Sequence, residues 1–63
     1  MLLTDIEGIE FELDKELMRS MLLVKHTKYG TCTEVTTKLR QVFYVRETPA
    51  EIMSKIREEA IQG

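Results

Sequence analysis

The stretch TPAEIMSKIREEAI at residues 48–61 gives the strongest local signal in the chain and predicts a C-terminal helix. Thr48 and Glu51 have the spacing of a capping box, in which the threonine hydroxyl accepts from the Glu51 amide and the Glu51 carboxylate accepts from the Thr48 amide. Pro49 falls at the first helical position, where its missing N–H costs nothing. We therefore expect a helix over about residues 49–61.

One face of this helix is apolar and predicts how the helix attaches to the rest of the fold. Apolar side chains spaced three to four residues apart lie on one side of a helix. Glu51 and Lys55, four residues apart, are expected to pair on the polar side. The expected buried stripe consists of Ile52, Met53, Ile56 and Ala60, with Ile61 as a further candidate.

The chain before residue 48 begins with the pattern of a β-hairpin. Residues 2–5 predict a short strand, and Gly8 predicts a turn because glycine tolerates a positive φ. Asp14 is expected to cap a short helical turn that brings Leu17 and Met18 to one end of the core. In the second strand, period-2 alternation is expected to bury one set and hydrate the other. The buried set is Ile9, Phe11 and Leu13, and the hydrated set is Glu10, Glu12 and Asp14.

Three further segments predict a second sheet region. Residues 21–24 form a continuous apolar run, typical of a strand with both faces covered. Gly30 is the expected turn residue before the β-branched residues 31–37, and residues 37–40 are the expected hairpin connection. Residues 41–46 are the expected last strand. We expect its inward side chains to be Phe43 and Val45, and its outward ones to be Val42 and Tyr44.

Residues 14–25 also fit a second structure. Their leucine and methionine side chains have helical spacing too, so a helix capped by Asp14 is the alternative to a strand. We expect a mainly β (α+β) fold, with a small antiparallel sheet or partly closed barrel of four to five strands over about residues 1–47. The C-terminal helix completes one domain of 63 residues.

The small size and the composition limit the kinds of protein this chain can be. A domain of about 60 residues buries only roughly 60% of the surface that its unfolded chain exposes, and small domains compensate with disulfides, a metal or self-association. One cysteine and one histidine provide neither a disulfide pair nor a zinc-type ligand set. We therefore expect no cofactor, no metal and a homo-oligomer.

The sequence predicts neither a membrane helix nor a secretory signal. Uncharged runs such as Ser20–Val24 are far shorter than the roughly 20 apolar residues of a membrane helix. The first residues lack the basic region and the long apolar stretch of a secretory signal. We expect a cytoplasmic protein without a membrane partner.

Charge is distributed unevenly, although the net charge is only −2. Residues 1–18 hold six acidic side chains against Lys15, whereas residues 19–46 hold six cationic side chains against Glu34. In one interpretation, acidic and basic strands lie side by side and pair, within or between subunits. In the other, the middle segment presents an anion-binding face.

The middle segment also mixes cations with aromatic rings. Such a mixture can follow a phosphate backbone while the rings stack on bases, which predicts a binder of nucleic acid or of a small anionic nucleotide. A reactive pairing of His26 with Cys32 would need a positive cleft that so short a chain scarcely encloses, so we expect no enzyme. The candidate binding residues are Lys25, His26, Lys28, Tyr29, Lys38, Arg40, Tyr44 and Arg46.

Both ends of the chain resemble one family. The resemblance is carried by Leu3-Thr4, Gly8, Phe11, Leu13-Asp14, the run Val45–Ile52 and Ile56. On these residues the chain is similar to the FlbD-like family of short proteins encoded near flagellar genes, and to small phage and mobile-element proteins. The resemblance implies a shared fold and a bacterial or phage origin, and it assigns no site residue.

These observations favour one function class and leave a second open. The first is a small non-enzymatic protein–protein interaction or regulatory module that self-associates, with a host or phage protein as a further partner. The alternative is a binder of nucleic acid or nucleotide through the basic middle segment.

Overall fold

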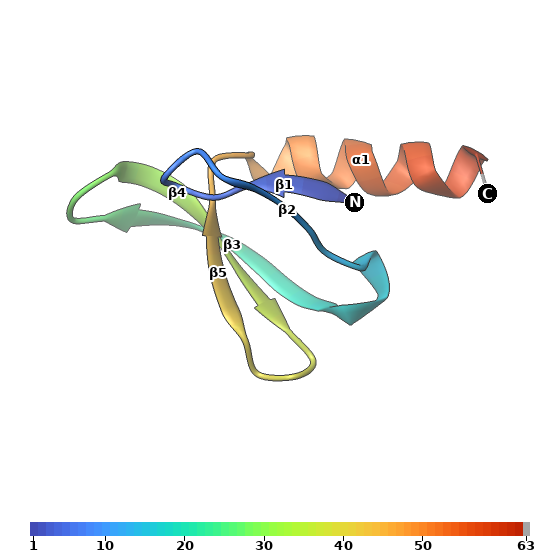
Figure 1. The fold of residues 1–63 in the computed structure, drawn as a ribbon, viewed down its shortest axis with the longest axis horizontal. Helices are drawn as coiled ribbons and strands as arrows, with labels where there is room; N and C mark the ends of the chain where they lie inside the picture. Colours follow the sequence, from blue (N-terminus) through green and yellow to red (C-terminus); the bar gives the residue numbers. More distant parts are fainter. Residues whose placement is uncertain (63) are drawn as a thin grey trace.

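The structure of the protein, a computed structural model, describes the backbone of residues 1–62 and the side chains of residues 1–60. Within this range it is a small, mainly β, α+β fold with one C-terminal helix (Figure 1), as the sequence predicts. The elements are β1 (Leu2–Thr4), β2 (Glu10–Glu12), the 3₁₀ helix η1 (Lys15–Leu17), β3 (Met18–His26), β4 (Gly30–Thr37), β5 (Val42–Val45) and α1 (Pro49–Gln62).

The strands form two antiparallel sheets and no closed barrel. β1 pairs with β2, and the second sheet has the order β3-β4-β5. A single bridge between Asp5 and Val45 joins the two sheets. It is flanked by hydrogen bonds from the Ile6 amide to the Tyr44 carbonyl at 3.2 Å and from the Arg46 amide to the Thr4 carbonyl at 2.8 Å. The β1–β2 hairpin thus extends the β5 side of the sheet, and β3 is left at the opposite edge.

A small core lies between the sheets and α1. Leu3, Val35, Val45 and Ile52 are fully buried, and they come from β1, β4, β5 and α1. Phe43 packs against this cluster, which confirms the predicted inward face of β5. The core is therefore assembled from side chains of β1, β4, β5 and α1, with Phe11 of β2 and Met18 and Met21 of β3 packed against it.

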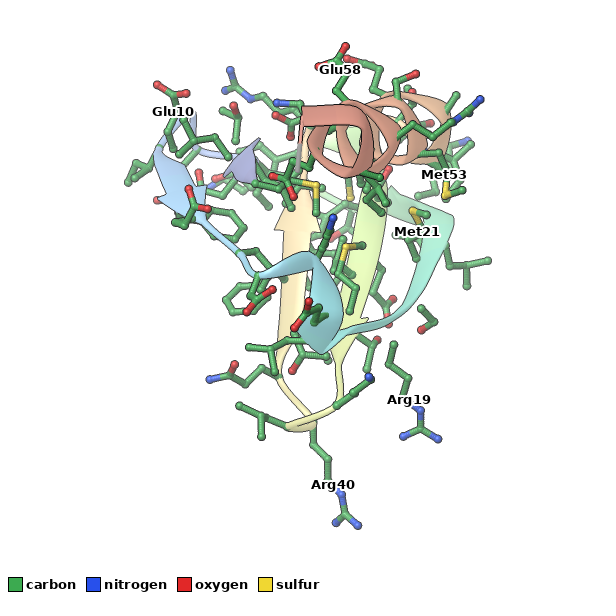
Figure 2. All side chains as sticks on the ribbon, turned by 90° about the vertical axis from the view of Figure 1, so that its right-hand side faces the viewer. Glu10, Arg19, Met21, Arg40, Met53 and Glu58 are labelled. Atoms are coloured by element: carbon green, nitrogen blue, oxygen red, sulfur yellow. The ribbon has the colours of Figure 1, made fainter. Side chains whose placement is uncertain are left out.

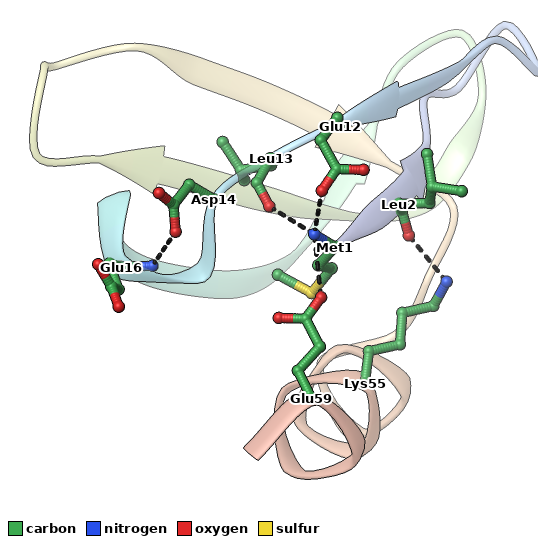
Figure 3. Close-up of polar contacts among 8 residues, drawn as sticks. All are labelled: Met1, Leu2, Glu12, Leu13, Asp14, Glu16, Lys55 and Glu59. Carbon is green, nitrogen blue, oxygen red and sulfur yellow. Dashed lines mark hydrogen bonds and ion pairs between the residues drawn. The ribbon is translucent and has the colours of Figure 1, made fainter. Parts of the chain in front are cut away.

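The local signals are confirmed in atomic detail. The Thr48 hydroxyl accepts from the Glu51 amide at 3.1 Å, and the Glu51 carboxylate accepts from the Thr48 amide at 3.2 Å. Asp14 accepts from the Glu16 amide at 3.0 Å and caps η1 (Figure 3). Gly8 has a φ of 92° in the β1–β2 connection.

The predicted apolar stripe of α1 is too wide. Ile52 is buried and Ile56 is half-buried, but Met53 is 41% exposed and Ala60 is exposed. The sheet beneath the helix is narrow, so it covers only one line of side chains. The Ile61 side chain lies outside the described residues.

Lys55 also departs from its predicted role. Its ammonium group donates to the carbonyl of Leu2 at 2.8 Å (Figure 3) and fastens the helix to β1. The predicted pair with Glu51 is absent from the ion pairs of side chains 1–60. The Glu51 carboxylate is instead engaged at the cap of its own helix.

Residues 18–26 form a strand, so the alternative helix over residues 14–25 is wrong. The prediction that both faces of residues 21–24 are covered is wrong as well, because Leu22 and Leu23 are 63% and 54% exposed. β3 lies at the edge of its sheet, where no neighbouring strand shields these side chains. Ile9 is 60% exposed too, because it precedes β2 at the end of the turn.

Acidic and basic segments do not pair across the strands of this chain. Among side chains 1–60, both ion pairs involve the Met1 amino group, which lies 2.5 Å from Glu12 and 3.0 Å from Glu59 (Figure 3). The hydrogen bond to Glu12 is the main cause that raises the pKa of this amino group; burial opposes the rise, and Glu59 adds to it. The cations of residues 19–46 are therefore not neutralised by the acidic N-terminal segment.

A buried carboxylate that the sequence did not reveal joins β1 to the chain before α1. Both oxygens of Glu47 lie 2.9 Å from the Thr4 amide, which donates to them. The Glu47 carbonyl accepts from the Thr33 hydroxyl at 2.6 Å, and both residues are buried. Three segments far apart in sequence therefore meet at one residue.

Candidate functional site

Four of the predicted binding residues, three of them aromatic rings, form a cluster at one end of the second sheet. The His26 ring centre lies 5.3 Å from that of Tyr29 and 5.5 Å from that of Tyr44. The Lys28 ammonium lies 5.3 Å from the centre of the Tyr29 ring. These four residues, His26, Lys28, Tyr29 and Tyr44, are called the ring cluster below.

The local sequence explains how the ring cluster forms. His26 ends β3 and pairs with Gly30, and its Nδ1 accepts from the Lys28 amide at 3.1 Å, which orients the imidazole. Strand register places Gly30 and Cys32 on the same face of β4 as His26 and Tyr44. Because both side chains are small, rings from β3 and β5 can meet across the strand.

Two other predicted cations lie near this end of the sheet with different surroundings. Arg46 donates to the Ile6 carbonyl at 3.2 Å, so its guanidinium holds the β1–β2 turn. It also lines a hollow of about 190 Å³ with Tyr29 and Cys32. Lys25 precedes His26 and therefore points to the opposite face of β3.

The remaining predicted residues, Lys38 and Arg40, lie in the turn between β4 and β5. Figure 2 shows Arg40 at the tip of this turn, on the side of the molecule away from α1. The turn at residues 27–29 is at the other end of β4. The eight candidates thus form two separate groups, and the cations do not converge on one face.

Cys32 and His26 do not share a pocket. Cys32 is buried and lines the 190 Å³ hollow, but His26 is not among its lining residues. A larger open hollow of about 450 Å³ lies between the β1–β2 turn and β5, with Asp5 and Glu7 at its wall. Within residues 1–62, no three His, Cys, Asp or Glu side chains gather in a way that could hold a metal ion.

A second candidate surface is the outer edge of β3. Within residues 1–62, β3 pairs with β4 alone, so the backbone groups along its other side have no strand partner. Leu22 and Leu23 are exposed there. Figure 2 shows Met53 of α1 on the same side of the molecule as Met21 of β3. This surface, with Leu22, Leu23 and Met53, is called the β3 edge below.

Sequence reasoning missed the β3 edge because a continuous apolar run looks the same whether neighbours in the chain or a second molecule cover it. The exposed and buried hydrophobic residues of the whole fold do carry a signal. Among side chains 1–60, nine large hydrophobic residues are exposed, whereas seven hydrophobic residues are buried. Single exposed residues are normal, but adjacent ones such as Leu22 and Leu23 mark surfaces that associate.

The described part of the chain has no helix with the length and the hydropathy of a membrane span. Comparisons with protein-family models, with curated proteins and with solved structures give no match to this chain.

Proposed function

We propose that the protein is a small non-enzymatic interaction module that self-associates through the β3 edge. The observation that carries this proposal is an edge strand of nine residues with two leucines more than half exposed at its middle. Natural proteins shield such edges with charges, prolines or a covering segment, because an open edge pairs with other chains. At the middle of β3, from Met21 to Val24, the chain has none of these charges or prolines.

The energies suggest an association that depends on concentration. Full burial of an exposed leucine gains roughly 1.5–3 kcal/mol, and a dimer would cover two leucines from each copy. This gain is of the same order as the cost of bringing two molecules together, which starts at roughly 4 kcal/mol. Strand pairing along the edge adds hydrogen bonds that water would otherwise satisfy.

Light scattering over a range of protein concentrations tests the proposal. We expect a mass that rises toward twice the 7.4 kDa of one chain, and we expect Leu23→Lys to keep the protein at the mass of one chain. Leu39→Lys is the matched control, because Leu39 is 64% exposed in the turn between β4 and β5. A wild-type mass of one chain at every concentration refutes the proposal.

The same edge would accept a strand from another protein. Strand addition requires unpaired backbone N–H and C=O groups along an edge strand, and contacts for alternate side chains of the added strand. A host or phage protein in the bacterial cytoplasm is the partner that fits the FlbD-like resemblance. Such a partner would compete with self-association, and added partner should lower the mass of the self-associated form.

The ring cluster favours a second candidate function, the binding of single-stranded nucleic acid or a nucleotide. Tyr29 and Tyr44 are 38% and 36% exposed, so a base could stack on them while Lys28 meets a phosphate. Titration of a labelled single-stranded oligonucleotide at low salt tests it. Tyr44→Ala and Lys28→Ala should weaken binding, whereas Lys38→Ala, at the other turn, should not. Equal affinities for all three variants contradict this function.

A further inference from the structure

We infer that β3 pairs antiparallel with β3 of a second copy about a twofold axis at Leu23, so that Leu23 faces Leu23 and Leu22 faces Val24 of the other copy. This inference rests on the proposed self-association and adds the register. Both copies use the same strand, as in an isologous interface.

Symmetry limits the registers available. Rotation about a twofold axis perpendicular to the sheet does not exchange the two faces of the sheet. Residues that lie opposite each other across the interface must therefore point to the same face. Side chains alternate along a strand, and opposite residues are therefore an even number of positions apart in sequence. The axis must then pass through a residue and not between two residues.

The regularity of β3 selects the residue. The ladder between β3 and β4 is unbroken from Ser20 to His26, and its register shifts between Met18 and Ser20. A shift of this kind bends the strand and turns its edge away from a straight partner. The straight part, Ser20–His26, has seven residues, and Leu23 is at its centre.

Charge excludes the neighbouring axis at Leu22. An axis at Leu22 would place Arg19 directly opposite Lys25 twice, and like charges at such positions are destabilising. An axis at Leu23 places Lys25 opposite Met21 and Ser20 opposite His26. Arg19 then falls outside the paired residues.

The helix α1 gives a further reason why a second copy of this chain would cover the β3 edge. Leu23 shares a face of β3 with Met21, which packs against the core on the side where α1 contacts β3. Met53 of α1 is 41% exposed on this side of the molecule (Figure 2). A second copy placed along β3 would bring its own Met53 to the same side, and both methionines would gain apolar contacts.

Disulfide trapping tests the register. The test uses Leu23→Cys in a Cys32→Ala background, with Leu22→Cys as the matched control. Opposite residues of antiparallel strands have Cα atoms about 4.5–5.5 Å apart, which is within disulfide reach, whereas a residue and the diagonal neighbour of its partner are about 7–8 Å apart. We expect mild oxidation to link Leu23→Cys into dimers and to leave Leu22→Cys largely unlinked. A mixture of Leu22→Cys with Val24→Cys should link the two different chains.

The outcomes separate the register from the association itself. Preferential linkage of Leu22→Cys, or a dimeric mass with neither variant linked, overturns the axis at Leu23 and leaves self-association in place. A mass of one chain at every concentration, with no linkage, overturns both. If Cys32→Ala fails to fold, the same series in the wild-type background gives the answer, because Cys32 is only 4% exposed.

Discussion

Replacement of Glu47 by alanine should destabilise the fold more than the loss of any other single carboxylate among side chains 1–60. Glu47 is 9% exposed, and both of its carboxylate oxygens lie 2.9 Å from the Thr4 amide. Glu47→Ala removes this acceptor and leaves a partly buried N–H without a partner. The substitution keeps the backbone carbonyl that accepts from Thr33, so its effect reports the side chain alone.

The size of the effect follows from these contacts. A hydrogen bond to a charged group contributes roughly 1.5–3 kcal/mol, and we expect a loss of about 2 kcal/mol. A domain of this length has a total stability of roughly 3–9 kcal/mol. For a small domain, 1 kcal/mol corresponds to a shift in Tm of about 4–8 °C, so the midpoint should fall by roughly 8–16 °C.

Thermal unfolding followed by circular dichroism measures this effect. All variants should be compared at one protein concentration, because self-association shifts the midpoint by mass action. Glu47→Gln keeps one acceptor oxygen and should fall between the wild type and Glu47→Ala. Glu58→Ala, on the exposed face of α1 (Figure 2), should change the free energy of unfolding by less than about 0.5 kcal/mol. Equal midpoints for Glu47→Ala and Glu58→Ala would refute the reasoning.

Three further predictions concern the ends of elements. Thr48→Ala removes one half of the capping box and should cost about 1 kcal/mol of unfolding free energy; an unchanged denaturation midpoint would count against the cap. Arg40 has a φ of 64°, so Arg40→Gly should stabilise the turn by about 0.5–1 kcal/mol, and a lower Tm would contradict this. The raised pKa of the Met1 amino group, caused mainly by Glu12, means that its stabilisation is complete below the pKa of the unfolded chain and is lost as pH rises through the folded pKa. The Tm of the chain should therefore fall as the pH rises on the alkaline side. Acetylation of the Met1 amino group should remove the part of this fall that the group causes. Identical pH profiles of Tm for the free and the acetylated chain would contradict this role of the amino group.

Signals that act within a few residues predicted the fold well. The capping box at Thr48, the cap at Asp14 and the turn at Gly8 all depend on neighbours in the sequence. Each is fixed by local geometry, and each is present in the structure. The two strand faces of β5 were also predicted, since the alternation of Phe43 and Val45 sets them directly.

Features that depend on which strands pair could not be predicted in the same way. Leu22 and Leu23 are exposed because β3 is at an edge, and strand order does not appear in the periodicity of one segment. Glu47 is buried at the join of the two sheets, where its carboxylate accepts from the Thr4 amide. Nothing near residue 47 in the sequence reveals a donor 43 residues away.

The candidate site was predicted in its residue types but not in its grouping. His26 and Tyr29 belong to one turn, so their contact is local, whereas Tyr44 joins them only through the register of β4 with β5. The separation of Lys38 and Arg40 follows from topology. Consecutive turns lie at opposite ends of the strand between them, so cations in both turns cannot serve one small ligand.

The wrongly predicted core positions support the proposed association. Leu22, Leu23 and Met53 were all expected to be buried, and all three belong to the β3 edge. Errors of a pattern alone would be scattered over the surface, as Ile9 is at the β1–β2 turn and Ala60 is near the end of α1. Leu22 and Leu23 lie next to each other on the open edge strand β3, which suggests instead that the hydrophobic pattern indicates burial correctly, and that a second molecule supplies the cover. Leu23→Lys distinguishes a side chain that is simply exposed from one that a second molecule covers. A chain covered by a partner should lose its higher mass but keep its own fold, because no core contact of the single chain depends on that side chain.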